Sequence, residues 1–275
     1  MAAKLSSTML GLLPELRYEP TPKRIRANLN GGTIVDTQRA LLVWEPRRVT
    51  PILAVPEDDL AATLSQQTEE SCGQEFPFAG MLDGPPVLDP RTAFSRHTTA
   101  GTPLTLSSAD RTLPGAAFRP DDDALGGYVL LDFDVLTWWE DDEPIIGHPR
   151  DPFHRVDIRR TSKHIAVQCE GTLLAETTRA ELLYETMLPP RTYIPPDDVR
   201  LDLMEPSTTT TVCPYKGQAS YYSFAGSSGP LDVAWTYDSR FPDATQIHGL
   251  ICFFDERADI LVDGIQQERP HTPWS

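Results

Sequence analysis

Two stretches of the chain, residues 23–58 and 163–198, align with each other without a gap at a constant offset of 140. Ten of the 36 aligned positions are identical, whereas chance would give about two. The identical pairs include Gly31/Gly171, Thr37/Thr177, Arg39/Arg179, Glu45/Glu185, Pro56/Pro196 and Asp58/Asp198. Internal repetition of this kind indicates a duplicated domain, so the sequence predicts two related folds.

The alignment also predicts the domain boundaries. We place an N-terminal extension at 1–17, the first repeat at 18–147, a proline-bounded linker at 148–157 and the second repeat at 158–275. Beyond residue 58 the offset falls from 140 to 116, so the first repeat carries about 24 additional residues, placed in an insertion near 69–90. The two copies act as an internal control. A residue kept in both points to a structural role, and chemical residues found in only one point to a site there.

Short apolar runs and turn signals predict strands in both repeats. The tight-turn pairs are Asn30-Gly31, Glu170-Gly171 and Asp263-Gly264, each between two such runs. Pro56 and Pro196 each precede acidic residues, a pattern that predicts one short helix per repeat. The predicted fold class is therefore mainly β. It consists of two repeated small antiparallel β domains, each with a short helix, packed together as a pseudo-dimer in a monomeric protein.

The charge balance excludes several partners. The net charge is −16, from 24 Lys and Arg against 40 Asp and Glu, which argues against nucleic acid and anionic membranes as partners. The four cysteines, at positions 72, 169, 213 and 252, form neither a disulfide framework nor a zinc pattern. The apolar run at 9–13 is too short for a signal sequence or membrane span. We expect a cytoplasmic protein with no metal and no cofactor.

The second repeat contains the predicted ligand site, around the string CPYKG at 213–217. The predicted ligand-binding residues are Lys216, Tyr221, Tyr222, Trp235, Tyr237, Tyr193 and Arg179, and the candidate catalytic residues are Cys213 and Lys216. Aromatic walls with one cation suit a small-molecule pocket, with Trp235, Tyr222 and Tyr237 as the wall. The Lys216 ammonium would also favour a thiolate at Cys213. The alternative interpretation is that the aromatic residues are core and Cys213 a buried apolar side chain.

The first repeat lacks this combination. The alignment places His97 opposite Cys213, Ala100 opposite Lys216, Thr105 and Leu106 opposite Tyr221 and Tyr222, and Phe118 opposite Trp235. Losing the lysine and the thiol together favours a site in the second repeat. A site around His97 in the first repeat is the alternative.

Four charged residues kept in both copies are interpreted as two structural ion pairs, Arg39–Glu45 and Arg179–Glu185. Asp58 and Asp198 are interpreted as acids at helix starts.

Several strings together resemble the tandem proteins of the domain-of-unknown-function family 427. They are RALLVWEPRRV (39–49), EDDEPIIGHPRDPFHRVD (140–157), YIPPDDVRLDLMEPSTTTTVCPYKG (193–217), AWTYD (234–238) and VDGIQQERPHTPWS (262–275). The resemblance implies compact antiparallel domains of the β-tent class, which includes zinc proteins and methionine-sulfoxide reductases. This chain lacks the paired Cys-x-x-Cys knuckles common in that class.

The family is sometimes labelled nucleotidyltransferase-like, and such an enzyme needs two carboxylates on one strand face to hold Mg²⁺. Asp132 and Asp134 have that spacing, but the second repeat has Phe254 and Glu256 at the aligned positions. The leading hypothesis is thus a small-molecule-binding module. An enzyme using Cys213 and Lys216, a nucleotidyltransferase and a protein-interaction scaffold are the alternatives.

Overall fold

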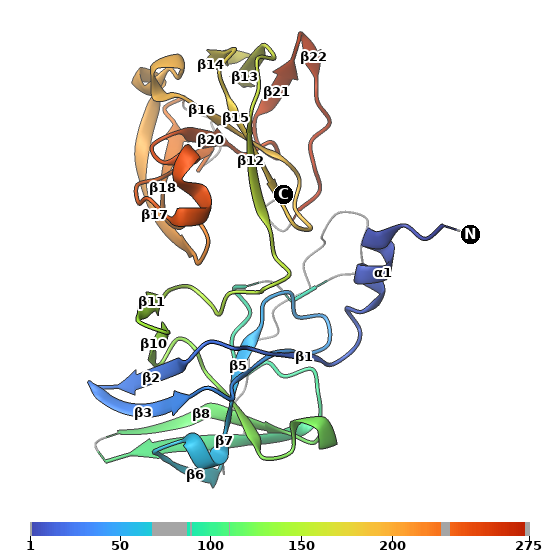
Figure 1. Cartoon of the computed structure of the whole chain (residues 1–275). Helices are drawn as coiled ribbons and strands as arrows, with labels where there is room; N and C mark the ends of the chain where they lie inside the picture. Colours follow the sequence, from blue (N-terminus) through green and yellow to red (C-terminus); the bar gives the residue numbers. More distant parts are fainter. Residues whose placement is uncertain (1, 68–86, 89, 110, 227–231, 273–275) are drawn as a thin grey trace. The chain divides into compact units, whose positions relative to one another are not determined.

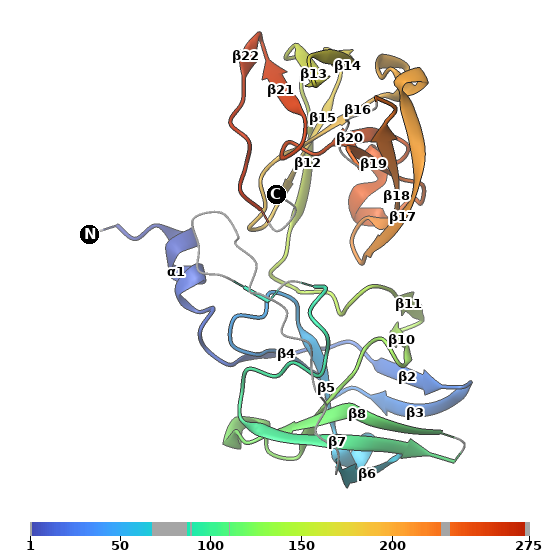
Figure 2. The ribbon, with the colours of Figure 1, turned by 180° about the vertical axis from the view of Figure 1, so that it is seen from behind.

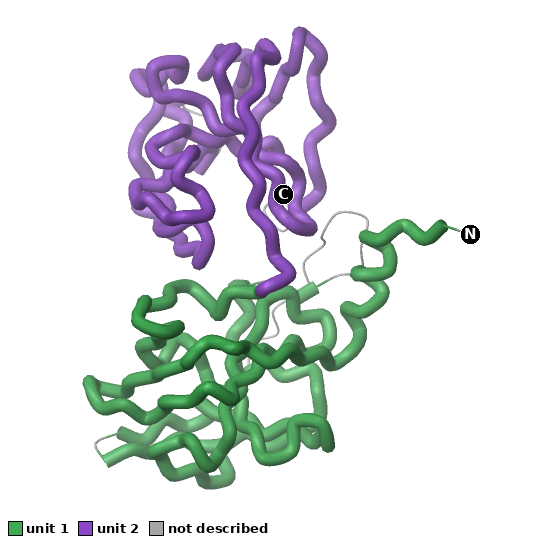
Figure 3. The backbone as a smooth tube through the Cα atoms, in the orientation of Figure 1, with its two compact units in different colours: residues 1–79, 84–151 green, residues 80–83, 152–275 purple. Residues whose placement is uncertain are grey.

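The computed structural model describes residues 2–67, 87–88, 90–109, 111–226 and 232–272 (Figure 1). The described chain forms two compact units, which divide between Asp151 and Pro152 (Figure 3). We call them unit 1 and unit 2. Nearly all of the predicted insertion near 69–90 lies outside the described residues. No helix in the described part is long and apolar enough to cross a membrane.

Unit 1 contains two antiparallel sheets. The seven-stranded sheet has the order β1 (Arg17–Pro20), β4 (Leu41–Trp44), β5 (Ile52–Pro56), β9 (Tyr128–Leu131), β8 (Arg111–Pro120), β7 (Gly101–Ser108) and β6 (Thr63–Gln66). The four-stranded sheet has the order β11 (Glu143–Ile145), β10 (Thr137–Glu140), β2 (Ile25–Leu29) and β3 (Gly32–Thr37). The extension contributes α1 (Leu5–Gly11), none of whose residues is buried.

Unit 2 repeats this topology strand for strand, and Figure 2 shows its strands from behind. Its seven-stranded sheet has the order β12 (Val156–Arg160), β15 (Glu181–Glu185), β16 (Arg191–Ile194), β20 (Ile251–Phe253), β19 (Ala234–Tyr237), β18 (Gly217–Phe224) and β17 (Met204–Cys213). Its four-stranded sheet has the order β14 (Thr172–Thr177), β13 (Ile165–Cys169), β21 (Asp259–Val262) and β22 (Ile265–Gln266). The prediction of two similar antiparallel β domains is confirmed.

The predicted hairpins are also confirmed. Asn30 and Gly31 join β2 to β3 with φ of 50° and 85°, and Glu170 and Gly171 join β13 to β14 with φ of 50° and 76°. Positive φ at both central residues gives the twist that a two-residue hairpin needs, and glycine adopts it without strain. Asp263-Gly264 joins β21 to β22 in the same way, with φ of 51° and 80°.

The short helix expected in each repeat is a single 3-10 turn, η1 (Glu57–Asp59) or η3 (Pro196–Asp198). Each turn ends after three residues because the next residue, Leu60 or Val199, has an extended backbone. Leu60 forms an isolated bridge with Val35, and Val199 forms one with Ala175. In unit 2 the chain continues through η4 (Leu201–Leu203) into strand β17. Two further 3-10 turns are η2 (Asp123–Leu125) and η5 (Pro242–Ile247).

Each seven-stranded sheet is apolar on both faces. In unit 2 one face packs with the four-stranded sheet around Ile165, Ile194 and Phe253. The other face carries a second apolar group, which we call the outer cluster. Its buried members are Ile158, Leu183, Tyr193, Ala219, Trp235, Tyr237, Ala244, Ile247, Cys252 and Phe254. The predicted aromatic site residues are distributed between these two faces.

Candidate functional site

The predicted aromatic wall does not form, because its members lie on opposite faces of the sheet. Tyr221 pairs with Trp235 across β18 and β19, and both pack in the outer cluster. Tyr222 pairs with Ala234 and packs against the core between the two sheets. Successive residues of a strand point to opposite faces. The grouping of Tyr222 with Trp235 and Tyr237 is therefore wrong.

The remaining aromatic residues are interior side chains of unit 2. Trp235 and Tyr237 are each 7% exposed, and Tyr193 is 1% exposed. The indole N–H of Trp235 donates to the hydroxyl of Tyr193 at 3.2 Å, and the two rings meet edge to face. Burial raises the pKa of both Tyr193 and Tyr237. This contact satisfies a buried polar group, as a packed core requires.

Lys216 forms a buried ion pair with Glu185. The two side chains are 9% and 6% exposed, and the Lys216 ammonium donates to Glu185 Oε2. His154 Nε2 lies 2.9 Å from the other carboxylate oxygen. Burial alone would raise the pKa of Glu185, but the charge of Lys216 and the hydrogen bond from His154 hold it at about 2. Burial would lower the pKa of Lys216, but Glu185 raises it above its ordinary value. The half-buried Cys213 packs against the outer cluster close by.

Unit 1 buries the equivalent glutamate with different partners. Glu45 is fully buried, and its Oε1 accepts the backbone N–H of Thr98 at 3.1 Å and of Thr99 at 3.4 Å. Its Oε2 lies 3.2 Å from His97 Nδ1 and 3.6 Å from Arg48 Nε. The predicted pairs Arg39–Glu45 and Arg179–Glu185 are therefore wrong, since each glutamate finds its counter-charge elsewhere.

The sheets also correct the alignment of the repeats in this region. Trp235 is paired with Tyr221, whereas Phe118, its equivalent, is paired with Pro103. Pro103 and Leu104 are therefore the counterparts of Tyr221 and Tyr222, two residues earlier than aligned. The same shift of two residues makes Thr98, rather than Ala100, the counterpart of Lys216. The backbone N–H of Thr98 contacts Glu45, as the Lys216 ammonium contacts Glu185. The conclusion that unit 1 lacks a lysine there is unaffected.

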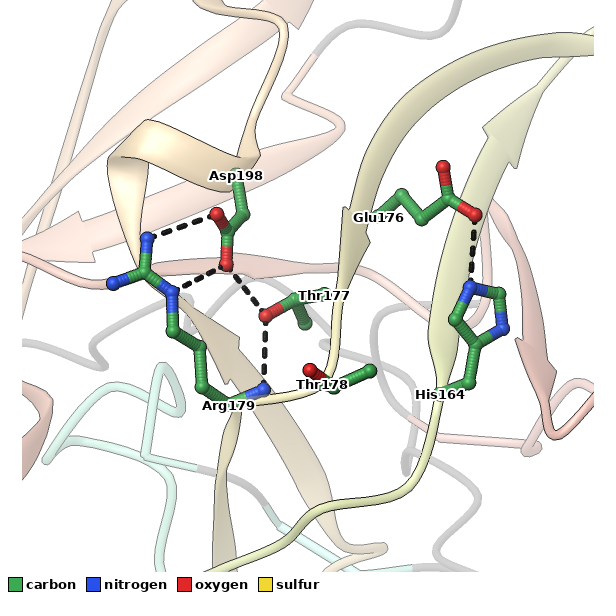
Figure 4. Close-up of a pocket in the computed structure, with 6 residues that line it drawn as sticks. All are labelled: His164, Glu176, Thr177, Thr178, Arg179 and Asp198. Carbon is green, nitrogen blue, oxygen red and sulfur yellow. Dashed lines mark hydrogen bonds and ion pairs between the residues drawn. The ribbon is translucent and has the colours of Figure 1, made fainter.

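Among the predicted residues, Arg179 lines an open pocket in unit 2 (Figure 4). This Arg179 pocket has a volume of about 370 Å³ and is lined by His164, Glu176, Thr177, Thr178, Arg179 and Asp198. Arg179 Nε and Nη2 each donate to Asp198 at 2.9 Å. The Thr177 hydroxyl donates to Asp198 at 2.6 Å and accepts the Arg179 backbone N–H at 3.1 Å. Asp198 thus fixes Arg179 in place.

The same brace occurs in unit 1. Arg39 Nε and Nη2 donate to Asp59 at 3.1 and 2.6 Å, and the Thr37 hydroxyl donates to Asp59 at 2.6 Å. The counterpart of Asp198 is therefore Asp59 rather than Asp58. Asp58 and Asp198 both lie in the first turns of η1 and η3, so their interpretation as acids at helix starts is confirmed, and Asp198 also holds Arg179. The presence of this Arg–Asp–Thr brace in both units marks the brace as part of the shared scaffold.

Three positions around this brace differ between the units. In unit 1 Arg24 forms a bidentate pair with Asp36, at 2.7 and 2.5 Å. At the equivalent place in unit 2, His164 Nε2 makes one contact of 2.8 Å with Glu176. The third difference is Gln38 in unit 1 against Thr178 in unit 2. Figure 4 shows His164 and Glu176 opposite the Arg179–Asp198 pair, with Thr178 between them.

The second repeat matches a known protein family. A family described as "Domain of unknown function (DUF427)" matches residues 157–264. Unit 2 is a DUF427 domain. The resemblance seen in the sequence is thereby confirmed for this repeat, and the Arg179 pocket lies inside the matched range. No curated protein matches the chain.

The carboxylates considered for nucleotidyl transfer lie in unit 1, outside the matched DUF427 range. Strand β9 ends at Leu131, and Asp132 Oδ1 accepts the backbone N–H of Asp134 at 3.1 Å. The two carboxylates therefore belong to a turn, and the prediction that they share one strand face is wrong. Within the described ranges, no group of three or more His, Cys, Asp or Glu side chains is placed to hold a metal ion.

Sequence reasoning missed His164, Glu176 and Thr178 as pocket residues of the DUF427 domain. The signal that would have found them is the conserved pair of Thr177 and Arg179 in the repeat alignment, because these residues flank Thr178. Thr178 and its counterpart Gln38, which differ between these fixed neighbours, are both exposed. The sequence singled out Asp198 as an acid at a helix start. Its contact with Arg179 is between residues 19 positions apart and is seen only in the fold.

Proposed function

We propose that the DUF427 domain of unit 2 is a binding module for a small polar molecule, which occupies the Arg179 pocket. One observation carries this proposal. The positions that differ between the two units, His164, Glu176 and Thr178, surround the unchanged brace and line an open pocket. A scaffold kept constant with variable side chains at its opening is the arrangement expected of a binding site on a duplicated domain.

The brace supports binding because it holds Arg179 in one geometry. Two hydrogen bonds to Asp198 and one to Thr177 fix the guanidinium and its backbone, yet the side chain stays 59% exposed. A side chain ordered before the ligand arrives loses less conformational entropy on binding. An arginine held in this way is suited to an oxygen-rich group on the ligand.

This location replaces the aromatic pocket expected around Trp235. The Lys216 ammonium is neutralised by Glu185, and Trp235, Tyr237 and Tyr193 fill the outer cluster. A side chain that already satisfies a buried partner is expensive to redirect toward a ligand. The same ion pair removes the cation that a reaction at Cys213 would require.

We place this function in the cytoplasm. The cysteines in the described part of the chain, Cys169, Cys213 and Cys252, are free thiols, which suits a reducing compartment. The net charge of −16 supports a small molecule rather than nucleic acid as the ligand.

The test is a variant that gives unit 2 the pocket of unit 1. His164→Arg, Glu176→Asp and Thr178→Gln are introduced together, and a library of small polar compounds is screened against both proteins by amide chemical-shift changes. We expect compounds that shift the amides of residues 176–179 in the natural protein and not in the variant. The proposal fails if no compound shifts these amides, or if every binder is retained by the variant.

A further inference from the structure

The acidic residue beside the brace has different partners in the Arg179 pocket and in its counterpart in unit 1. Both contain an Arg–Asp brace, in which one positive and one negative charge cancel. In unit 1 the neighbouring Asp36 is also neutralised, by the permanently charged Arg24. In unit 2 the neighbour Glu176 makes a single 2.8 Å contact with the His164 imidazole and stays 56% exposed. The unit 2 pocket therefore presents an exposed carboxylate in contact with an imidazole, where unit 1 has a carboxylate held by a bidentate arginine.

The negative charge and the arginine lie at opposite sides of the pocket. Glu176 is 56% exposed and stands on strand β14, whereas Arg179 follows that strand and is 59% exposed. The pair with Asp198 uses Nε and Nη2 of Arg179. Nη1 lies outside that pair, and Thr178 lies between the two sides (Figure 4). The pocket thus offers an acceptor at one side, and donors at the other.

We infer that the ligand is a small molecule with a primary ammonium group at one end and a carboxylate at the other. The ammonium donates to the exposed carboxylate of Glu176. The carboxylate accepts from Arg179 and the Thr178 hydroxyl, in the way that guanidinium groups commonly bind carboxylates. This inference rests on the proposed function, because it names the ligand class of the same pocket.

The distance between the two ends is tested with a series of linear amino acids: β-alanine, γ-aminobutyrate and ε-aminocaproate. Butyrate lacks the ammonium group and butylamine lacks the carboxylate, so each serves as a single-group control. Binding to the full chain is measured by titration, following the amides of residues 176–179. We expect one member of the series to bind roughly tenfold more tightly than butyrate, since each charged contact that is lost weakens binding.

Glu176→Gln separates the two ends of the ligand. We expect this variant to bind the best amino acid roughly tenfold more weakly and to leave the affinity for butyrate unchanged. Asp36→Asn in unit 1 is the matched control and should change neither affinity. Equal affinity for butyrate and the amino acids, or full binding by Glu176→Gln, would overturn the inference.

The same experiment distinguishes failure of this inference from failure of the proposed function. If the amino acids do not bind, but a neutral or anionic library compound binds the natural protein and is lost in the triple variant, the pocket is functional and the inferred ligand class is wrong. If neither the amino acids nor any library compound binds there, both proposals are rejected.

Discussion

Glu45 in unit 1 and Glu185 in unit 2 occupy equivalent buried positions, yet their surroundings differ. Glu45 directly follows β4, and Glu185 is the last residue of the equivalent strand β15. Glu45 is held by two backbone N–H groups, His97 and Arg48. Glu185 is held by Lys216 and His154. A buried carboxylate must be paired and hydrogen-bonded, and the two units meet this requirement with different residues.

This comparison explains an asymmetry that looks functional in the sequence. Lys216 has no lysine counterpart in unit 1, because there backbone groups and Arg48 satisfy the glutamate. Its presence in only one repeat therefore reflects an exchange of counter-charges inside the fold. The Arg179 pocket shows the opposite case, since there the internal partners are the same in both units and the exposed neighbours differ.

The largest expected effect comes from removing the counter-charge of Glu185. We expect Lys216→Met to lower the free energy of unfolding by about 3–5 kcal/mol, because it leaves a buried carboxylate without its main partner. Urea denaturation measures this, and amide hydrogen exchange in β15 and β18 localises it to unit 2. Thr98→Ala in unit 1 is the control, with an expected loss of about 1 kcal/mol from the hydrogen bond to Pro46. Equal losses in the two variants would contradict the comparison.

The pH dependence of stability sharpens the same comparison. The pKa of Glu185 is about 2 in the folded protein, below its ordinary value of 4.5. A carboxylate whose pKa is lowered by folding stabilises the fold at pH values above its ordinary pKa. That contribution is lost as the pH falls from the ordinary pKa toward the lowered one. We expect unit 2 to lose about 3 kcal/mol between pH 4.5 and pH 2 from this group. The measurement is urea denaturation across that range, and Glu185→Gln should flatten the dependence. An unchanged slope in that variant would show that other groups cause it.

A second buried charge in unit 2 should act in the opposite direction. Burial raises the pKa of Asp255 to about 6, despite Arg191 nearby. An aspartate with a raised pKa destabilises the folded state once it ionises, so the penalty is present above pH 6 and disappears toward pH 4. We expect Asp255→Asn to raise the free energy of unfolding by about 1–3 kcal/mol at pH 7.5, with no gain at pH 4. The exposed Asp197→Asn is the control. Thermal denaturation at both pH values tests this, and a loss of stability at pH 7.5 would contradict it.

The smallest effects are expected at the two braces. Arg39→Ala and Arg179→Ala each remove an exposed arginine from an aspartate and should lower the urea midpoint slightly and equally, since exposed ion pairs contribute little to stability. Only Arg179→Ala should weaken binding in the Arg179 pocket. Ligand titration of both variants checks this, and a ligand that is lost equally from both would mean that the brace acts through the fold alone.

The sequence was sufficient to predict the repeated β fold. The repeat alignment and the turns at Asn30-Gly31 and Glu170-Gly171 depend on local backbone preferences, which are legible without long-range contacts. The faces of β18 were also predictable, because alternation along a strand is local. The grouping of Tyr222 with Trp235 failed because neighbouring strands set which residues share a face, and their register is a property of the whole sheet.

The partners of charged residues were the least predictable part of the site. Arg179 and Glu185 are close in sequence, yet their partners, Asp198 for one and His154 and Lys216 for the other, arrive from separate elements. Sequence distance says little about such contacts, since a turn brings remote side chains together. Arg179 is among the candidate ligand-binding residues predicted from the sequence, and a ligand-binding role for it stays a prediction.

The most direct test of this account is the number of ligand molecules bound when the pocket is exchanged between the units. Arg24→His, Asp36→Glu and Gln38→Thr give unit 1 the pocket of unit 2, and the reverse triple variant removes the pocket from unit 2. Calorimetric titration with the best ligand should give one site in the natural protein, two sites in the first variant and none in the second. One site in all three proteins would place the ligand elsewhere and contradict the account.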